Sequence, residues 1–136
     1  MELGVRIGRA ALDAIVVHAR ETAPAECCGL LLGHAAEITE AVRTRNVADQ
    51  AQSRFVIDPK DHIDGRRDAR LRGLEVLGFY HSHPSSPPSP SETDRAEASY
   101  PGHLYVIVSL AGAAPDIALF RLEQGNFHRL SFVTVG

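Results

Sequence analysis

The chain has 136 residues, of which 44% are hydrophobic, enough to form one domain around a single core. Its 14 Lys and Arg residues against 17 Asp and Glu residues give a net charge of -3, which excludes the broad basic surface that holds nucleic acid. No apolar run approaches the roughly 20 residues of a membrane-spanning helix, and the first residues lack a secretory pattern. We therefore expect one cytoplasmic domain over residues 1–136, with neither nucleic acid nor a membrane as a partner.

A helix and a hairpin are predicted in the first third of the chain. Apolar residues recur at helical spacing over residues 8–20 and predict a helix that packs one face on a sheet. The run 29–33 is apolar and bounded by glycines, which indicates a buried strand. Residues 38–47 are its expected partner in a hairpin.

Two neighbouring cysteines, Cys27 and Cys28, precede that strand. Adjacent cysteines rarely reach disulfide geometry, and zinc sites built on cysteine use spaced pairs of ligands. We therefore expect both thiols to pack in the core, and any metal to use other ligands.

The rest of the chain alternates strand and helix patterns. Residues 55–57 indicate a short strand, and Asp58 followed by Pro59 predicts a helix that begins there and ends near residue 72. A strand over residues 76–80 runs into His81. The remaining predictions are a proline-rich loop at 85–90, a helix at about 90–99, and strands at 103–110, 117–122 and 127–135. This mixture indicates an α/β (α+β) fold with one main sheet.

His81 and His83 lie two residues apart at the end of a predicted strand, so both imidazoles point to the same side. Two convergent nitrogen donors suit zinc. Pro84 ends the strand pairing and leaves the pair beside a loop, where catalytic groups commonly lie.

Asp94 is the candidate third donor, and two helix registers are open for it. With Ser89 as the cap and Pro90 as the first helical residue, Ser91 and Asp94 lie inside the helix on one face, free to address a metal. With Ser91 as the cap, Asp94 is its partner in a capping box. The pattern alone favours the second register, because capping is far commoner than ligation.

Taken together, Glu26, the run from His81 to Pro84, and the run from Ser91 to Asp94 resemble the JAMM motif of the MPN-plus metalloproteases. The family pattern is Glu, then His-x-His, seven residues, then Ser-x-x-Asp, and this sequence matches every position. The short chain is similar to the compact prokaryotic branch of that family.

The resemblance implies that His81, His83 and Asp94 bind one zinc ion per chain. It implies that Glu26 is the general base that activates a zinc-bound water, and that Ser91 stabilises the tetrahedral intermediate. It also implies a curved mixed β-sheet flanked by helices, with a layering like that of cytidine deaminases.

The implied activity is hydrolysis of the peptide or isopeptide bond after the C-terminal Gly-Gly of a small ubiquitin-like or sulfur-carrier protein. We expect the tail to lie against the sheet near the metal as an added strand. A general zinc peptidase and a non-catalytic scaffold module are the alternatives. A zinc nucleobase deaminase is excluded, because its His-x-Glu and Pro-Cys-x-x-Cys signature is absent.

Overall fold

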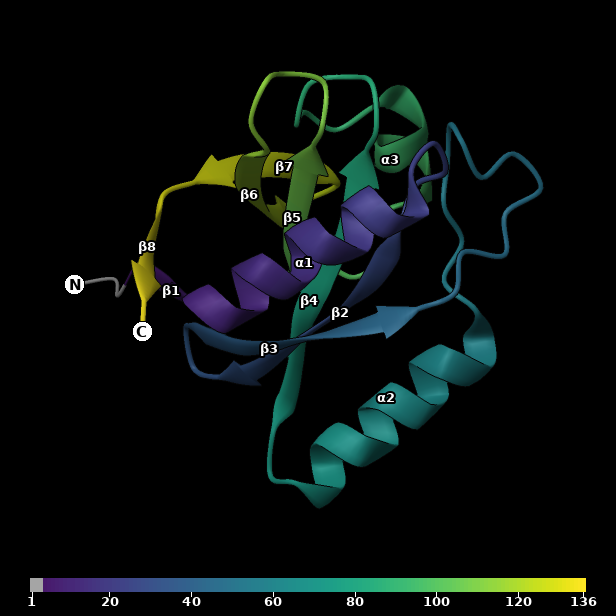
Figure 1. The fold of residues 1–136 in the computed structure, drawn as a ribbon. Coiled ribbons are helices and arrows are strands. Elements are labelled where there is room, and N and C mark those ends of the chain that lie inside the picture. Colours follow the sequence, from purple (N-terminus) through teal and green to yellow (C-terminus); the bar gives the residue numbers. More distant parts are fainter. Residues whose placement is uncertain (1–3) are drawn as a thin grey trace.

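The computed structural model of the chain describes residues 4–136, and the strands of that part form one eight-stranded mixed sheet. In chain order the strands are β1 (Val5–Gly8), β2 (Cys28–His34), β3 (Glu37–Thr44), β4 (Glu75–His83), β5 (Leu104–Ser109), β6 (Asp116–Glu123), β7 (Asn126–Leu130) and β8 (Phe132–Val135). Across the sheet their order is β7-β6-β5-β4-β2-β3-β1-β8 (Figure 1). The strand that carries both histidines of the motif, β4, is therefore internal.

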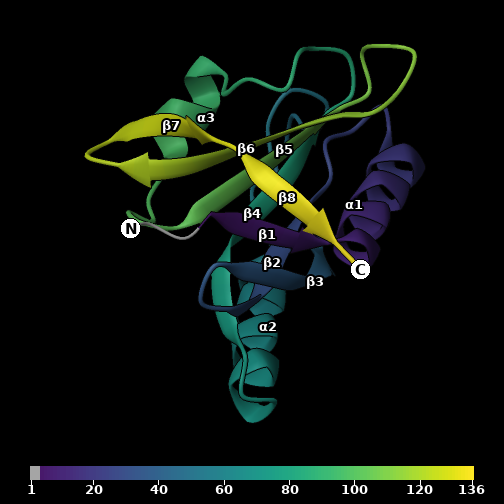
Figure 2. The same cartoon turned by 90° about the vertical axis from the view of Figure 1, so that its left-hand side faces the viewer.

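Three helices cover the two faces of this sheet: α1 (Arg9–Thr22), α2 (Pro59–Leu71) and α3 (Glu92–Glu97). Seen from two directions, α1 lies on one side of the strands, and α2 and α3 lie on the other (Figures 1 and 2). Ile15 and Ala19 of α1 are fully buried against the first face. Gly65 lets α2 approach the second face, because a Cβ there would lie 2.4 Å from Leu30 Cδ1.

Side chains of β4 alternate between the two faces, as a strand requires. Tyr80 packs in the cluster under α1, whereas Phe79 packs in the cluster under α2. His81 and His83 share the parity of Phe79 and so lie on the face that carries α2 and α3. The alternation places both histidines of the motif on one side, as the sequence predicts.

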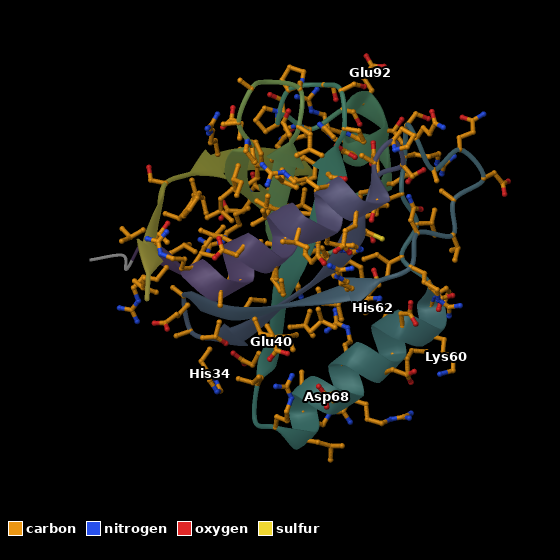
Figure 3. The ribbon with its side chains drawn as sticks, in the orientation of Figure 1. His34, Glu40, Lys60, His62, Asp68 and Glu92 are labelled. Carbon is orange, nitrogen blue, oxygen red and sulfur yellow. The ribbon has the colours of Figure 1, made fainter. Side chains whose placement is uncertain are left out.

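Two predicted helices are confirmed, and their ends follow from local chemistry. α1 matches the helical spacing of the sequence. α2 begins at the expected place, since Asp58 caps it by accepting a hydrogen bond from the Asp61 amide. Arg72 then ties α2 to β3, because its guanidinium contacts Glu40 and Asp68, whose side chains lie close together in Figure 3.

The strand predictions were wrong in three places. Residues 55–57 do not form a strand, and their one β-contact is an isolated bridge between Ile57 and Asn46. The segment 127–135 is two strands, since β7 pairs with β6 at one edge of the sheet and β8 pairs with β1 at the other. The sequence pattern also did not predict β1.

No helix within the described residues is long and apolar enough to cross a membrane.

Candidate metal centre

Three donor atoms converge where the end of β4 meets α3. The Nε2 atoms of His81 and His83 lie 3.2 Å apart, and Asp94 Oδ2 lies 3.1 Å from the first and 3.2 Å from the second. All three residues are buried. Zinc bound tetrahedrally at about 2.0–2.1 Å holds its ligand atoms about 3.3 Å apart. The spacing of these donors therefore fits a zinc ion without rearrangement.

The two imidazoles are fixed by different contacts. His83 Nδ1 lies 2.7 Å from the Pro87 carbonyl oxygen, so Nδ1 donates and the Nε2 lone pair faces the centre. The ring of His81 stacks on Phe55, with centroids 4.4 Å apart. Sequence reasoning missed both contacts. The sequence pattern places Phe55 in a strand, and the Pro87 contact is made by a main-chain atom.

Asp94 occupies the capping register, so the first of the two predicted registers was wrong. α3 begins at Glu92, and Ser91 has extended backbone angles with φ -77° and ψ 170°. Ser91 Oγ accepts from the Asp94 amide at 3.0 Å, while Asp94 Oδ2 accepts from the Ser91 amide at 2.9 Å. An ionised carboxylate oxygen has more than one lone pair, so the same Oδ2 atom caps the helix and faces both histidines. Capping and ligation are thus compatible.

The charges in this cluster favour a cation. Burial acts to raise the pKa of Asp94. The two imidazoles outweigh this effect and hold that pKa far below its usual range. Burial lowers the pKa of His81, whereas the contact with Asp94 raises the pKa of His83 against the effect of burial. One carboxylate that stays ionised and two imidazole nitrogens are a donor set typical of zinc.

Glu26 lies two residues before the start of β2 and is buried, in reach of the charges of His83 and Asp94. Burial raises its pKa to about 7, with His83 opposing the shift and Asp94 adding to it. Among the described residues, nothing hydrogen-bonds its buried Oε1 atom. A carboxyl group with a pKa near neutrality and an unpaired oxygen suits the exchange of a proton with a water or substrate.

Main-chain contacts position Glu26. Its amide donates to the Ala51 carbonyl at 2.7 Å, and its carbonyl accepts from Asn46 Nδ2 at 3.0 Å. Asn46 also bonds within the loop, through the Arg54 carbonyl and the amides of Ala48 and Val56. Asn46 therefore joins the general-base candidate to the loop that carries Phe55. Sequence reasoning missed this residue, which stands alone in a polar stretch.

Ser91 is exposed at the start of α3. Because its Oγ accepts from the Asp94 amide, the hydroxyl hydrogen remains available to donate. Its role at a substrate oxygen stays a prediction.

The structure restricts the expected added strand of a substrate tail, because such a strand cannot pair with β4. β4 is paired with β2 on one side and with β5 on the other, and the β5 ladder extends to His83. Its backbone donors and acceptors are therefore occupied near His81.

Cys27 and Cys28 are both buried and unpaired, as expected. Cys28 Sγ lies 3.3 Å from Thr44 Oγ1, and Cys27 belongs to the cluster under α1. Burial raises the pKa of the Cys27 thiol to about 11 and that of Cys28 to about 12. Neither thiol has the lowered pKa of a reactive cysteine.

Comparisons with known proteins identify the family of the chain. Residues 8–123 match the family described as prokaryotic homologues of the JAB domain. A desampylase from Haloferax volcanii is 43% identical over 108 residues, which cover 75% of this chain and 78% of that protein. A Thermus thermophilus protein named "probable TtuB-protein conjugate cleaving protease" is 30% identical, and the match covers 88% of this chain and 77% of that protein.

Solved structures share the fold. A solution structure from Desulfitobacterium hafniense superposes with a TM-score of 0.87 at 26% identity, over 96% of this chain and 92% of that one. A JAB1/MPN domain protein from Archaeoglobus fulgidus has a TM-score of 0.68 at 21% identity, and the match covers 98% of this chain and 100% of that one. The predicted curved mixed sheet flanked by helices is confirmed. Since the family match spans most of the sequence and the relatives are enzymes, the chain belongs to the compact prokaryotic branch of the JAMM/MPN metalloprotease family and is an enzyme of that type.

Proposed function

We propose that this chain is a zinc-dependent hydrolase that cleaves the peptide or isopeptide bond after the C-terminal Gly-Gly of a small ubiquitin-like or sulfur-carrier protein. His81, His83 and Asp94 hold one zinc ion in this proposal. Glu26 is the general base and Ser91 is the oxyanion donor. The cytoplasmic location stays a prediction from the sequence.

The observation that carries the proposal is the convergence of three donor atoms, 3.1–3.2 Å apart, beside a buried glutamate with an unpaired oxygen. Structural zinc sites take four protein ligands, whereas catalytic sites take three and keep a position open for water. The described residues supply three such ligands in one group, His81, His83 and Asp94. The donor count therefore supports catalysis over a purely structural metal.

Each residue has one task in this mechanism. When bound, zinc would polarise the scissile carbonyl and lower the pKa of a water to about 7. Glu26 accepts the proton of the attacking water and later passes it to the leaving amine, which its raised pKa permits. Ser91 donates its hydroxyl hydrogen to the oxygen that becomes negative. His83 keeps its orientation through the Pro87 carbonyl.

The names of the relatives support the class of substrate. The Thermus thermophilus protein is named for cleaving TtuB-protein conjugates, and the Haloferax volcanii protein is named a desampylase. From these names we take the proposal that the substrate is one protein conjugated to another. The Gly-Gly tail itself comes from the family resemblance.

The test incubates zinc-loaded protein with conjugates of small ubiquitin-like carriers and identifies the products by mass spectrometry. We expect cleavage directly after Gly-Gly. Replacement of the last glycine by alanine and then by valine should lower kcat/KM progressively, because side chains keep the tail from passing close to the metal. Equal rates across that series, or a preference for unfolded peptides, would indicate a general peptidase. Zinc binding without any cleavage would indicate a scaffold module.

A further inference from the structure

A cavity of about 240 Å³ opens beside the metal centre, on the sheet face between α2 and α3. None of the roles described so far uses this cavity. Its walls are mainly aromatic and come from the loop before α2, from α2 and α3, and from β4, β5 and β7. The residues that line it and carry the argument are Phe55, Val56, His62, Phe79, Tyr100 and Tyr105.

The cavity has an apolar floor and a half-exposed rim. Phe79 and Tyr105 form the floor, with ring centroids 5.6 Å apart and both side chains buried. Tyr100 and Val56 stand at the rim and are 36% and 38% exposed. Sites for small molecules typically occupy roughly 300–1,000 Å³. The smaller space here suits a single large side chain, and its walls suit an apolar one.

The position of the cavity indicates which part of a substrate reaches it. His81 and Asp94 of the metal centre line the cavity, but Glu26 and Ser91 do not. In the proposed mechanism Glu26 delivers a proton to the leaving amine, so the amine lies on the Glu26 side. The acyl chain leads away from the amine, and we take its path to run along the cavity, which shares His81 and Asp94 with the metal centre.

Spacing selects one residue of that acyl chain. The floor residue Phe79 lies two residues before His81 on β4, which is about 7 Å along an extended strand. A tail on this face spans about the same distance with its two glycines. The side chain directly before Gly-Gly is therefore the first one that comes level with the floor.

We propose that this cavity binds an apolar side chain of the substrate tail, at the residue immediately before Gly-Gly. This inference rests on the proposed function and deepens it by adding a specificity site. The glycines pass the metal, and the preceding residue anchors the tail between Phe79 and Tyr100. The enzyme then selects its carrier proteins by their third residue from the end as well as by Gly-Gly.

The experiment uses the zinc-loaded full chain and a conjugate series with one carrier and one lysine leaving group. Only the residue before Gly-Gly changes, from leucine to alanine to aspartate. We expect kcat/KM to fall by about tenfold or more from leucine to alanine, mainly through KM, and to fall further for aspartate. Direct binding of the same tails, measured by calorimetry, should follow the same order.

A matched pair of variants locates the effect. Val56→Asp places a carboxylate at the rim of the cavity, whereas Val17→Asp makes the same change on the exposed side of α1, on the opposite face. Val56→Asp should lower kcat/KM for the leucine tail and bring the leucine-to-alanine ratio toward one. Val17→Asp should leave both values as in the wild type. If Val56→Asp does not fold, Tyr100→Ala replaces it with the same expectation.

The outcomes separate this inference from the proposed function. Cleavage of all three tails at equal rates would overturn the inference alone. A leucine preference that survives both Val56→Asp and Tyr100→Ala would also overturn it, because the preference would then arise elsewhere. Cleavage of no Gly-Gly conjugate by protein with a full zinc content would overturn the inference and the function together.

Discussion

Buried histidines lie on both faces of the sheet, and their surroundings differ. On the α1 face, His18 is 7% exposed, and its Nδ1 lies 2.8 Å from the Tyr80 hydroxyl. On the other face, His81 and His83 are 2% and 3% exposed and turn both Nε2 atoms toward Asp94. One site is a closed hydrogen bond between neutral groups. The other gathers two imidazole nitrogens around an ionised carboxylate.

The difference shows that burial alone does not mark a metal ligand. His18 has a neutral partner whose own proton is retained, since burial raises the pKa of the Tyr80 hydroxyl. The Asp94 carboxylate instead stays ionised between two imidazoles, an arrangement that a divalent cation completes. What distinguishes the site is a convergent anionic oxygen, and this oxygen comes from a separate element, α3.

The largest expected effect comes from removing the histidines of one face only. The His81→Ala, His83→Ala double variant should lose the bound zinc, from one ion per chain to none, together with all measurable cleavage. Elemental analysis of protein purified without added metal measures this. His18→Gln is the matched control, and it should keep one zinc per chain. Retention of zinc by the double variant would place the ligands elsewhere.

Glu26→Gln should lower turnover by about 10²–10⁴, because the amide keeps the shape of the side chain but cannot accept a proton. Zinc content and the melting temperature should stay close to those of the wild type. Turnover measured at matched zinc content provides the check. Wild-type rates in this variant would show that another group takes the proton.

Ser91 needs two variants, because the structure gives it a structural task besides the proposed catalytic one. Ser91→Ala removes both the hydroxyl donor and the helix cap, while Ser91→Gly removes the donor at a cost of only a few tenths of a kcal/mol in capping. Both should lose about 10²–10³ in turnover, as expected for one oxyanion donor. Only Ser91→Ala should also lower thermal stability. Normal turnover in Ser91→Gly would show that Ser91 only caps the helix and has no catalytic role.

How much of the fold could be predicted from the sequence depends on how far apart in the chain the interacting residues lie. The helical spacing of α1 and the cap at Asp58 are local signals, and both helices were predicted close to their observed bounds. β1 and β8 are four-residue strands that pair with each other from opposite ends of the chain. Such pairing has no local signature, so β1 was missed and β8 was merged with β7.

The candidate site likewise has a part that the sequence predicts and a part that it does not. The motif alone groups His81, His83 and Asp94, because the spacing of these residues is itself the signal. The register of α3 was left open, since Ser-x-x-Asp fits both a capping box and a ligand motif, although capping is the commoner of the two. In the structure, Asp94 Oδ2 caps the helix and also faces both histidines. The supporting contacts of Phe55 and Asn46 come from loop geometry, which the sequence pattern does not encode.

The smallest expected effect concerns stability on the α1 face. Burial lowers the pKa of His18 to about 4, with the charge of Arg43 acting in the same direction. An unfolded histidine has a pKa of about 6.5, so between these two values the unfolded state binds a proton that the folded state does not. The free energy of unfolding should therefore fall by about 2–3 kcal/mol as the pH drops from 6.5 to 4, and this contribution should level off below pH 4. Urea denaturation across this range compares the wild type with His18→Gln, which can still bond Tyr80 but does not titrate. A chelator in every sample removes the proton release that accompanies metal binding, and any titration of Glu26 affects both proteins equally. The gap between the two pH profiles thus isolates His18, and parallel profiles would contradict its assignment as a neutral buried histidine.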